Sequence, residues 1–251
     1  MTKPVTIIGN HISPFVRKVV AVCEMKGIAY EIDSIVPFFG NDEFERLSPL
    51  RRIPVLIDGD TVLLDSSVIA EYLDEKWPER PVLPRTPADR AKARWLDEFA
   101  DTRIADVLLW RVFGKALVAP AIFKVPRDLD AVAKTMADDV PPVMDYLEMV
   151  APGTGFLFGG APGLADVSVA SHFANARWAR QTFDATRWPR AVAWIERVEA
   201  AEPLRRLNEI GGKILRAPPG EHRPVLESFG VATTAATVGG PVPRRGPMTV
   251  I

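Results

Sequence analysis

The chain of 251 residues contains a single cysteine, which excludes an internal disulfide framework. Its three histidines, His11, His172 and His222, are scattered without the spacing of metal ligands, so we expect no metal site. The formal net charge of -1 gives no electrostatic reason to expect binding to nucleic acid or to an anionic membrane. No apolar run is long enough to cross a bilayer and no signal peptide is visible, so the sequence predicts a soluble, cytoplasmic protein.

The first 78 residues mix strand and helix patterns. Short apolar or alternating runs predict strands at residues 5–8, 30–35, 54–57 and 61–64. Helical spacing of apolar residues follows Pro14 and again follows Ser66. The last two strands flank Asp58-Gly59-Asp60, a hairpin signature, so we expect them to be antiparallel. A small mixed sheet with helices on its faces is the simplest fold for this order.

Proline and glycine mark the boundaries of the remaining chain. Three prolines between residues 78 and 84 indicate a linker at residues 79–86, after a first domain of residues 1–78. Residues 87–216 show helical periodicity only and predict an all-helical domain, whose last helix begins at Pro203 and fades by Gly211-Gly212. Prolines and glycines crowd residues 217–251, which predicts an extended or disordered tail.

The segment around Ser13 is the first candidate site. A strand ends at Gly9-Asn10, and Pro14 takes the first position of the next helix, which places Ser13 at the N-cap. A helix N-terminus offers unpaired N–H groups and a partial positive charge to an anion. Because serine and proline also begin ordinary helices well, the residues alone leave both interpretations open.

Two further residue pairs stand where predicted elements begin. Ile53-Pro54 follows two arginines, and it either marks a strand edge or offers the backbone of Ile53 to an added peptide strand. Asp65-Ser66 either caps a helix or holds an α-amino acid end group. In the second interpretation Ser66 binds the carboxylate and Asp65 faces the ammonium.

Four segments occur in one order and spacing, at residues 13–19, 47–56, 64–73 and 164–167. Together they resemble the cytosolic glutathione S-transferase superfamily, and the resemblance covers most of the chain except the tail. It implies an α/β plus all-α architecture: a thioredoxin-like N-terminal domain that binds glutathione, followed by an all-helical C-terminal domain with an electrophile pocket. It also implies a homodimer in which each first domain faces the partner's helical domain.

The resemblance assigns roles to the two residue pairs. It implies that the Ile53–Pro54 bond is cis, that Ile53 pairs with the cysteinyl backbone of glutathione, and that Arg52 lies near the glycyl carboxylate. It implies that Asp65 and Ser66 hold the γ-glutamyl end. Glutathione is then a co-substrate, and no metal is implied.

The resemblance also implies that Ser13 faces the glutathione sulfur. A hydroxyl and a helix N-terminus that stabilise the thiolate lower the thiol pKa, and the thiolate then attacks a small hydrophobic electrophile. Because position 13 is neither tyrosine nor cysteine, the chain resembles Ser-type members, and its first motif is nearest to tau-like and bacterial ones. Gly163 departs from the family pattern, which has Ser or Thr three residues before Asp166.

The electrophile pocket is drawn from both predicted domains, although large aromatics on a long helix more often belong to the core. Its candidates are His11, Phe38, Phe39, Trp110, Arg111 and Phe113. Cys23 lies on an apolar helix face, so we expect a buried residue with no redox role. Two other functions stay open: a glutathione-dependent thiol–disulfide oxidoreductase and a non-catalytic binding protein with the transferase fold.

Overall fold

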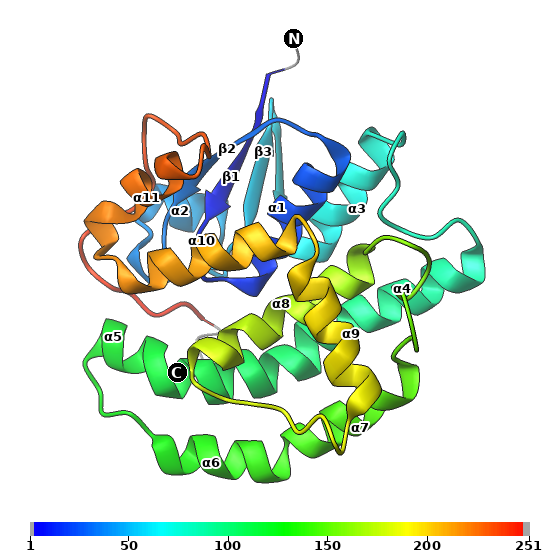
Figure 1. Ribbon diagram of the computed structural model, residues 1–251. Coiled ribbons are helices and arrows are strands. Elements are labelled where there is room, and N and C mark those ends of the chain that lie inside the picture. The colour runs from blue at the N-terminus through cyan, green and yellow to red at the C-terminus, as the bar shows by residue number, and fades with distance from the viewer. Residues whose placement is uncertain (1–2, 248–251) are drawn as a thin grey trace. The chain divides into compact units, whose positions relative to one another are not determined.

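The computed structural model describes residues 3–247, which form two compact units (Figure 1). The first unit extends to Pro81 and takes up the chain again from Arg206, whereas the second runs from Val82 to Arg205. Both units have the predicted architecture, a mixed sheet with helices and an all-helical unit.

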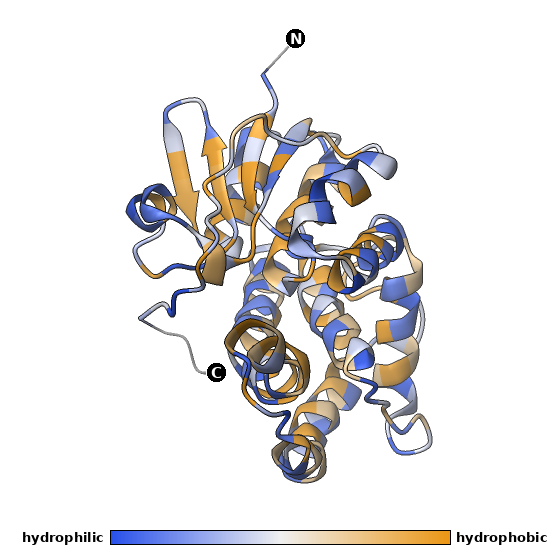
Figure 2. Cartoon of the chain, turned by 90° about the vertical axis from the view of Figure 1, so that its left-hand side faces the viewer, coloured by the Kyte–Doolittle hydropathy of each residue, from blue (hydrophilic) through white to orange (hydrophobic). Residues whose placement is uncertain are grey.

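The first unit is built on a four-stranded sheet with the order β2-β1-β3-β4. Its strands are β1 (Val5–Gly9), β2 (Tyr30–Ser34), β3 (Val55–Asp58) and β4 (Thr61–Leu64). Strands β1 and β2 are parallel, while β3 is antiparallel to both β1 and β4. Figure 2 shows apolar stretches along the strands; β1 and β3 supply most of the buried ones, whereas the apolar residues of β4 are largely exposed.

Helices of the first unit begin and end as their capping residues predict. They are α1 (Pro14–Lys26), η1 (Pro37–Phe39), α2 (Asp42–Leu47) and α3 (Ser66–Lys76). Helix α1 ends at Gly27, whose φ of 72° is in the left-handed region that favours glycine. Helices α1 and α3 lie side by side (Figure 1), and a buried ion pair joins Lys26 Nζ to Asp74 Oδ1 at 2.8 Å.

Apart from an isolated β-bridge between Phe156 and Gly159, the regular elements among the described residues of the second unit are helices. They are α4 (Pro87–Phe99), the π-helical η2 (Ala100–Val118), α5 (Ala119–Phe123), α6 (Leu129–Asp138), α7 (Val140–Val150), α8 (Leu164–Trp178) and α9 (Pro189–Ala200). Pro141 and Pro142 lie in the first turn of α7, where the absence of a backbone N–H is tolerated. Nearly all of α8 is buried, and it forms the centre of the unit.

The predicted extended or disordered tail begins with two short helical elements that the sequence did not indicate, and the described chain beyond them is extended. Helix α10 (Leu204–Arg216) is followed by η3 (Pro219–Glu221) and α11 (His222–Ser228), and the chain then lies along the free edge of β2. The Ile32 N–H donates to the carbonyl of Ala232 at 2.9 Å, and the Asn41 N–H donates to that of Val238 at 2.8 Å. Residues 248–251 of the predicted tail lie outside the described residues.

The predicted boundary at residue 216 also differs from the structure, which groups the chain from Arg206 onward with the first unit. The side chain of Arg206 gives the physical reason. Its guanidinium donates to Glu24 Oε1 at 2.7 Å and to the carbonyl of Phe229 at 2.6 Å. These bonds join α10 both to α1 and to the segment after α11.

Candidate functional site

The candidate residues of the first unit lie at one edge of the sheet, the one formed by the ends of the strands. The register pairs Ile8 of β1 with Val55 of β3, and Val55 with Leu64 of β4. The end of β1, the beginning of β3 and the end of β4 therefore meet at this edge. The Ile53-Pro54 pair directly precedes β3, the Asp65-Ser66 pair directly follows β4, and Ser13 follows β1 after a turn of three residues.

Ser13 caps the helix that begins just beyond this edge. Its backbone is extended, and its Oγ accepts a hydrogen bond from the Val16 N–H at 3.4 Å. This cap bond is long, and the side chain is only half-buried, so the hydroxyl is available to a ligand. The N-terminus of α1 adds a partial positive charge at the same place.

The turn before Ser13 is fixed from inside the unit. Buried Arg17 extends back along the turn and donates to the carbonyls of His11 and Ile12 at 2.6 and 3.0 Å. His11 itself is fully buried, and neither of its ring nitrogens has a hydrogen-bond partner within residues 3–247. Burial, reinforced by the positive charges of Arg17 and Arg206, lowers the pKa of His11 to about 3.

Acid is expected to destabilise the protein through His11. The pKa of His11 has its ordinary value of 6.5 in the unfolded chain and is lowered to about 3 in the folded protein. Between these two values the unfolded chain therefore binds a proton that the folded chain does not. Its stabilising contribution is present above pH 6.5 and is lost as the pH falls through this window, at about 1 kcal/mol per pH unit. Urea unfolding across the window should show this slope in the natural protein and a shallower one in His11→Leu. Equal slopes in the two proteins would contradict the assignment.

The Ile53–Pro54 bond is cis, as the resemblance implied. Ile53 is half-buried beside β3, and the neighbouring Arg52 is exposed. Ser48 fixes the backbone of Arg52, since its Oγ accepts from the Arg52 N–H at 3.0 Å and donates to the Arg52 carbonyl at 2.9 Å. The Arg52 guanidinium meets no hydrogen-bond or ionic partner among the described residues. It is therefore available to an anionic group.

Asp65 and Ser66 form the start of α3. Asp65 Oδ1 accepts from the backbone N–H groups of Ser67 at 2.9 Å and Val68 at 3.2 Å. Asp65 is exposed and has a φ of 73°, a conformation that residues other than glycine rarely adopt. Asp65 thus combines a capping role with a strained backbone conformation of the kind that often occurs at functional sites.

Candidates for the electrophile pocket divide into buried and partly accessible residues. Phe38 is buried and Phe39 is half-buried at the sheet edge of the first unit. In the helical unit, Phe113 is buried against Trp178, with ring centroids 6.2 Å apart, whereas Trp110 is half-buried. Phe113 therefore belongs to the core.

Arg111 is also occupied within the helical unit. Its guanidinium pairs with Asp106 at 2.9 Å and with Asp139 at 3.1 Å, and Arg103 pairs with the same two carboxylates. This network joins η2 to the start of α7. The geometry gives Arg111 a structural role.

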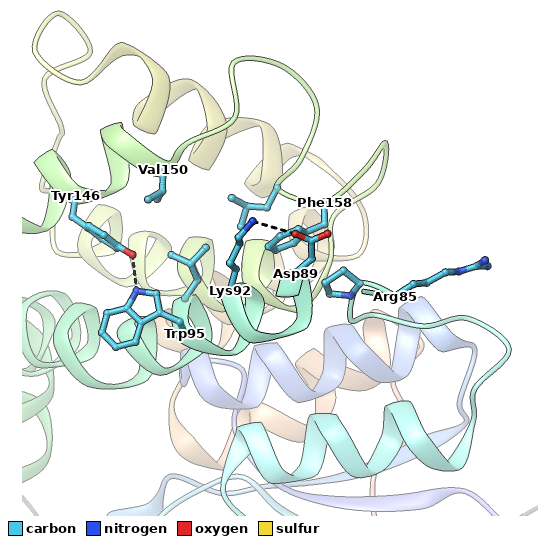
Figure 3. Close-up of a pocket in the computed structure, with 10 residues that line it drawn as sticks. Arg85, Asp89, Lys92, Trp95, Tyr146, Val150 and Phe158 are labelled. Atoms are coloured by element: carbon cyan, nitrogen blue, oxygen red, sulfur yellow. Dashed lines mark hydrogen bonds and ion pairs between the residues drawn. The ribbon is translucent and has the colours of Figure 1, made fainter. Parts of the chain in front are cut away.

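A cavity of about 720 Å³ in the helical unit was not anticipated from the sequence (Figure 3). It is lined by Pro84, Arg85, Asp89, Lys92, Trp95, Leu96, Tyr146, Val150, Leu157 and Phe158. The Trp95 indole N–H donates to Tyr146 Oη at 2.6 Å, and Lys92 pairs with Asp89 at 3.3 Å. The predicted site residues do not line this cavity. No sequence signal indicated it, because its lining residues come from three separate segments of the chain.

The structure also bears on the expected absence of a metal site and of a membrane-spanning helix. Within the described part of the chain, no group of three histidine, cysteine or acidic residues is arranged to hold a metal ion. Over the same residues, no helix combines the length and the apolar character needed to cross a bilayer. The expectations of a metal-free, cytoplasmic protein that binds no nucleic acid stay predictions.

Cys23 is fully buried, as predicted. Burial, together with the charge of Glu24, raises the pKa of the Cys23 thiol to about 12. The thiolate is the reactive form of cysteine, so this side chain is inert near neutral pH.

Comparison with known proteins places these features in a family. A model of the glutathione S-transferase N-terminal domain matches residues 8–81, and one of its C-terminal domain matches residues 118–197. Glutathione S-transferase U7 of Arabidopsis thaliana is 30% identical over 167 residues, which span 66% of this chain and 67% of that protein. A stringent starvation protein A homolog of Haemophilus ducreyi is 44% identical over 69 residues, or 28% of this chain and 32% of that protein.

Solved structures agree with the sequence comparison. Human glutathione S-transferase T1-1 superposes with a TM-score of 0.74 at 23% identity, over 90% of this chain and 97% of that one. The two units are thus a thioredoxin-like domain and a helical domain of the glutathione transferase fold. The chain belongs to the glutathione S-transferase family.

Proposed function

We propose that this chain is a glutathione transferase in which Ser13 activates the glutathione thiolate for attack on a small hydrophobic electrophile. The observation that supports the proposal most strongly is the sheet edge, where strand register brings Ser13, Ile53 and the Asp65-Ser66 pair together. No single motif carries this inference, because each of these residues also has an ordinary capping or strand-edge role.

The residues at the edge fit the chemical groups of glutathione. The exposed Arg52 guanidinium suits the glycyl carboxylate, and the exposed Asp65 carboxylate suits the γ-glutamyl ammonium. Ser66 is the first residue of α3, where N–H groups and the helix dipole favour the γ-glutamyl carboxylate. Ile53 offers backbone groups to the cysteinyl unit.

Glutathione supplies the sulfur nucleophile, and the chain stabilises its ionised form. We assign Ser13 the role of hydrogen-bond donor to the thiolate, with the N-terminus of α1 adding a partial positive charge. Ser13 does not itself attack. For the electrophile we retain Phe39 in the first unit and Trp110 in the helical unit as separate candidates, because each side chain is partly accessible.

Two assays distinguish conjugation from thiol–disulfide exchange. A halogenated aromatic compound with glutathione reports conjugation, and a mixed glutathione disulfide with free glutathione reports exchange. The proposal expects turnover of the halogenated compound. Turnover restricted to the disulfide would instead favour the oxidoreductase.

A non-catalytic binding function is the second candidate. Similarity to the stringent starvation protein A homolog favours it, since that relative is named for a starvation response and not for a transfer reaction. Glutathione binding without turnover in either assay would support this candidate.

We further propose that the chain forms a homodimer. Val62, Leu64 and Val68 on β4 and α3 are exposed in the first unit, with Val68 at 53%, and Trp95 is 55% exposed in the helical unit. Apolar side chains that cluster at the surface commonly mark an interface. Sedimentation at micromolar concentration should give twice the chain mass of 27.6 kDa. The Val68→Asp variant should shift toward monomer, whereas Val125→Asp on another exposed segment should not; a monomeric natural protein would refute the dimer.

A further inference from the structure

Asn10 is the residue that holds the turn before Ser13 in place. Its side chain is 1% exposed, and its Oδ1 accepts from the Ile12 N–H at 3.0 Å. Its carbonyl accepts from the Ser13 N–H at 2.9 Å. The orientation of Asn10 therefore determines where the Ser13 hydroxyl lies.

The other side of the Asn10 amide faces two different segments. Because Oδ1 is engaged by the Ile12 N–H, the group on the opposite side is the Nδ2 amide. It donates to Ser34 Oγ at 3.1 Å and lies 3.2 Å from Nδ1 of His222. The reversed amide would place N–H groups against the Ile12 N–H, so this orientation is determined by the network.

This orientation also fixes the tautomer of His222. Its Nδ1 must accept from Asn10, so this nitrogen carries no proton. The proton is therefore on the other ring nitrogen, and the backbone of Ala217 lies close enough to the ring to influence it. His222 is 4% exposed, so its ring is held inside the first unit with Nδ1 against Asn10.

His222 is firmly anchored, although it is more than two hundred residues from Asn10 in sequence. Helix α11 carries it, and the chain before and after α11 is bound to other parts of the first unit. Before α11, Arg206 donates to Glu24 Oε1 at 2.7 Å, and after it the Val238 N–H donates to Asp33 Oδ2 at 2.7 Å. A side chain held in this way can restrain a turn that it touches.

We propose that His222 is a positioning residue for Ser13, and that it acts through the side chain of Asn10. The inference rests on the proposed function, because it concerns the placement of the thiolate-activating hydroxyl. When the acceptor at Nδ1 is lost, Asn10 keeps Ser34 as its one partner on this side, and the buried amide is left partly unsatisfied. The turn then relaxes, and a small displacement of Ser13 lowers turnover.

Two substitutions at position 222 separate the two nitrogens of the ring. In His222→Asn the amide oxygen takes about the position of Nδ1, so the acceptor for Asn10 is kept and the Ala217 contact is lost. In His222→Gln the longer side chain reaches the position of the other nitrogen, so the Ala217 contact is kept and the acceptor is lost. The proposal expects the Gln variant alone to behave differently from the natural protein.

Amide hydrogen exchange at Ile12 and Ser13 is the first readout, and it needs no glutathione. We expect exchange of both amides about tenfold faster in His222→Gln and near the natural rate in His222→Asn. Equal rates in the Gln variant and the natural protein would overturn the proposal. Faster exchange in both variants would also overturn it, since the effect would then come from the Ala217 contact.

The thiol pKa of bound glutathione is the second readout. We expect it to rise by about one unit in His222→Gln, with kcat about tenfold lower and KM for glutathione within about twofold. In an Asn10→Ala background, the same Gln substitution should add nothing. If the natural protein does not lower the thiol pKa of bound glutathione, the proposed function is contradicted, whereas the hydrogen-exchange result at Ile12 and Ser13 still stands. A lowered thiol pKa that survives in His222→Gln contradicts the positioning role alone.

Discussion

The Asp166→Asn variant is expected to unfold with a free energy about 3 kcal/mol below that of the natural protein. The Asp166 carboxylate is 1% exposed and accepts three hydrogen bonds. Oδ1 accepts from the Leu157 N–H at 3.1 Å and from the Trp194 indole at 2.8 Å, and Oδ2 accepts from the Gly163 N–H at 3.0 Å. An asparagine in either orientation turns an NH₂ group toward one of these donors.

A matched control for this prediction is Asp184→Asn. Asp184 is exposed, and its Oδ1 accepts from the backbone N–H groups of Thr186 at 2.8 Å and Arg187 at 3.3 Å. The charge change is the same, but water can replace any hydrogen bond that the exposed side chain loses. We therefore expect the free energy of unfolding to fall by no more than about 1 kcal/mol. Urea unfolding followed by tryptophan fluorescence measures both variants. Equal costs would show that burial of the Asp166 network contributes little.

The Ser13→Ala variant is expected to lower turnover about a hundredfold with glutathione affinity nearly unchanged. The hydroxyl is assigned to the thiolate, which is formed during activation, whereas Arg52, Asp65 and Ser66 carry the binding of the rest of the molecule. Removal of a donor that acts on developing charge therefore changes kcat and leaves KM similar.

Thr86→Ala is the matched control for Ser13→Ala. Thr86 caps α4 through the Asp89 N–H at 3.1 Å and also precedes a proline at the first helical position. Both variants lose an N-cap, at a cost of about 1 kcal/mol in stability each. Only Ser13→Ala should lose turnover. A comparable loss in Thr86→Ala would mean that helix stability, and not thiolate activation, explains the effect.

Local sequence signals predicted the elements that carry the site. Ser13 and Thr86 both cap helices with proline next to them, and the hairpin around Gly59 pairs β3 with β4. These features depend on residues within a few positions of one another, so a single sequence contains them. The cis Ile53–Pro54 bond followed from the family resemblance, since only a few per cent of X–Pro bonds are cis.

Long-range packing decided the features that the sequence did not predict. The segment after α11 is ordered by partners such as Ile32 and Asn41, about two hundred residues away. Helix α10 continues beyond the glycines that were expected to end it, because Ile210 and Ile214 are fully buried. Such burial overrides the weak helix propensity of glycine.

Gly163 shows why a departure from the family pattern can have a structural reason. A Cβ at this position would lie 3.1 Å from the carbonyl oxygen of Val82, which accepts the Leu164 N–H at 2.9 Å. Asp166 Oδ2 accepts from the Gly163 N–H, so the helix start remains capped. Glycine thus stands at position 163, where the family has Ser or Thr, because the backbone of Val82 in the linker packs closely against it.

A glutathione titration followed by thiolate ultraviolet absorbance across pH, on the natural protein and on Ser13→Ala, tests the central claim most directly. We predict that the natural protein lowers the thiol pKa of bound glutathione by about one unit or more, and that Ser13→Ala binds glutathione without this shift. A natural protein that binds glutathione with an unshifted thiol pKa, or a variant that keeps the full shift, would contradict the assignment of Ser13.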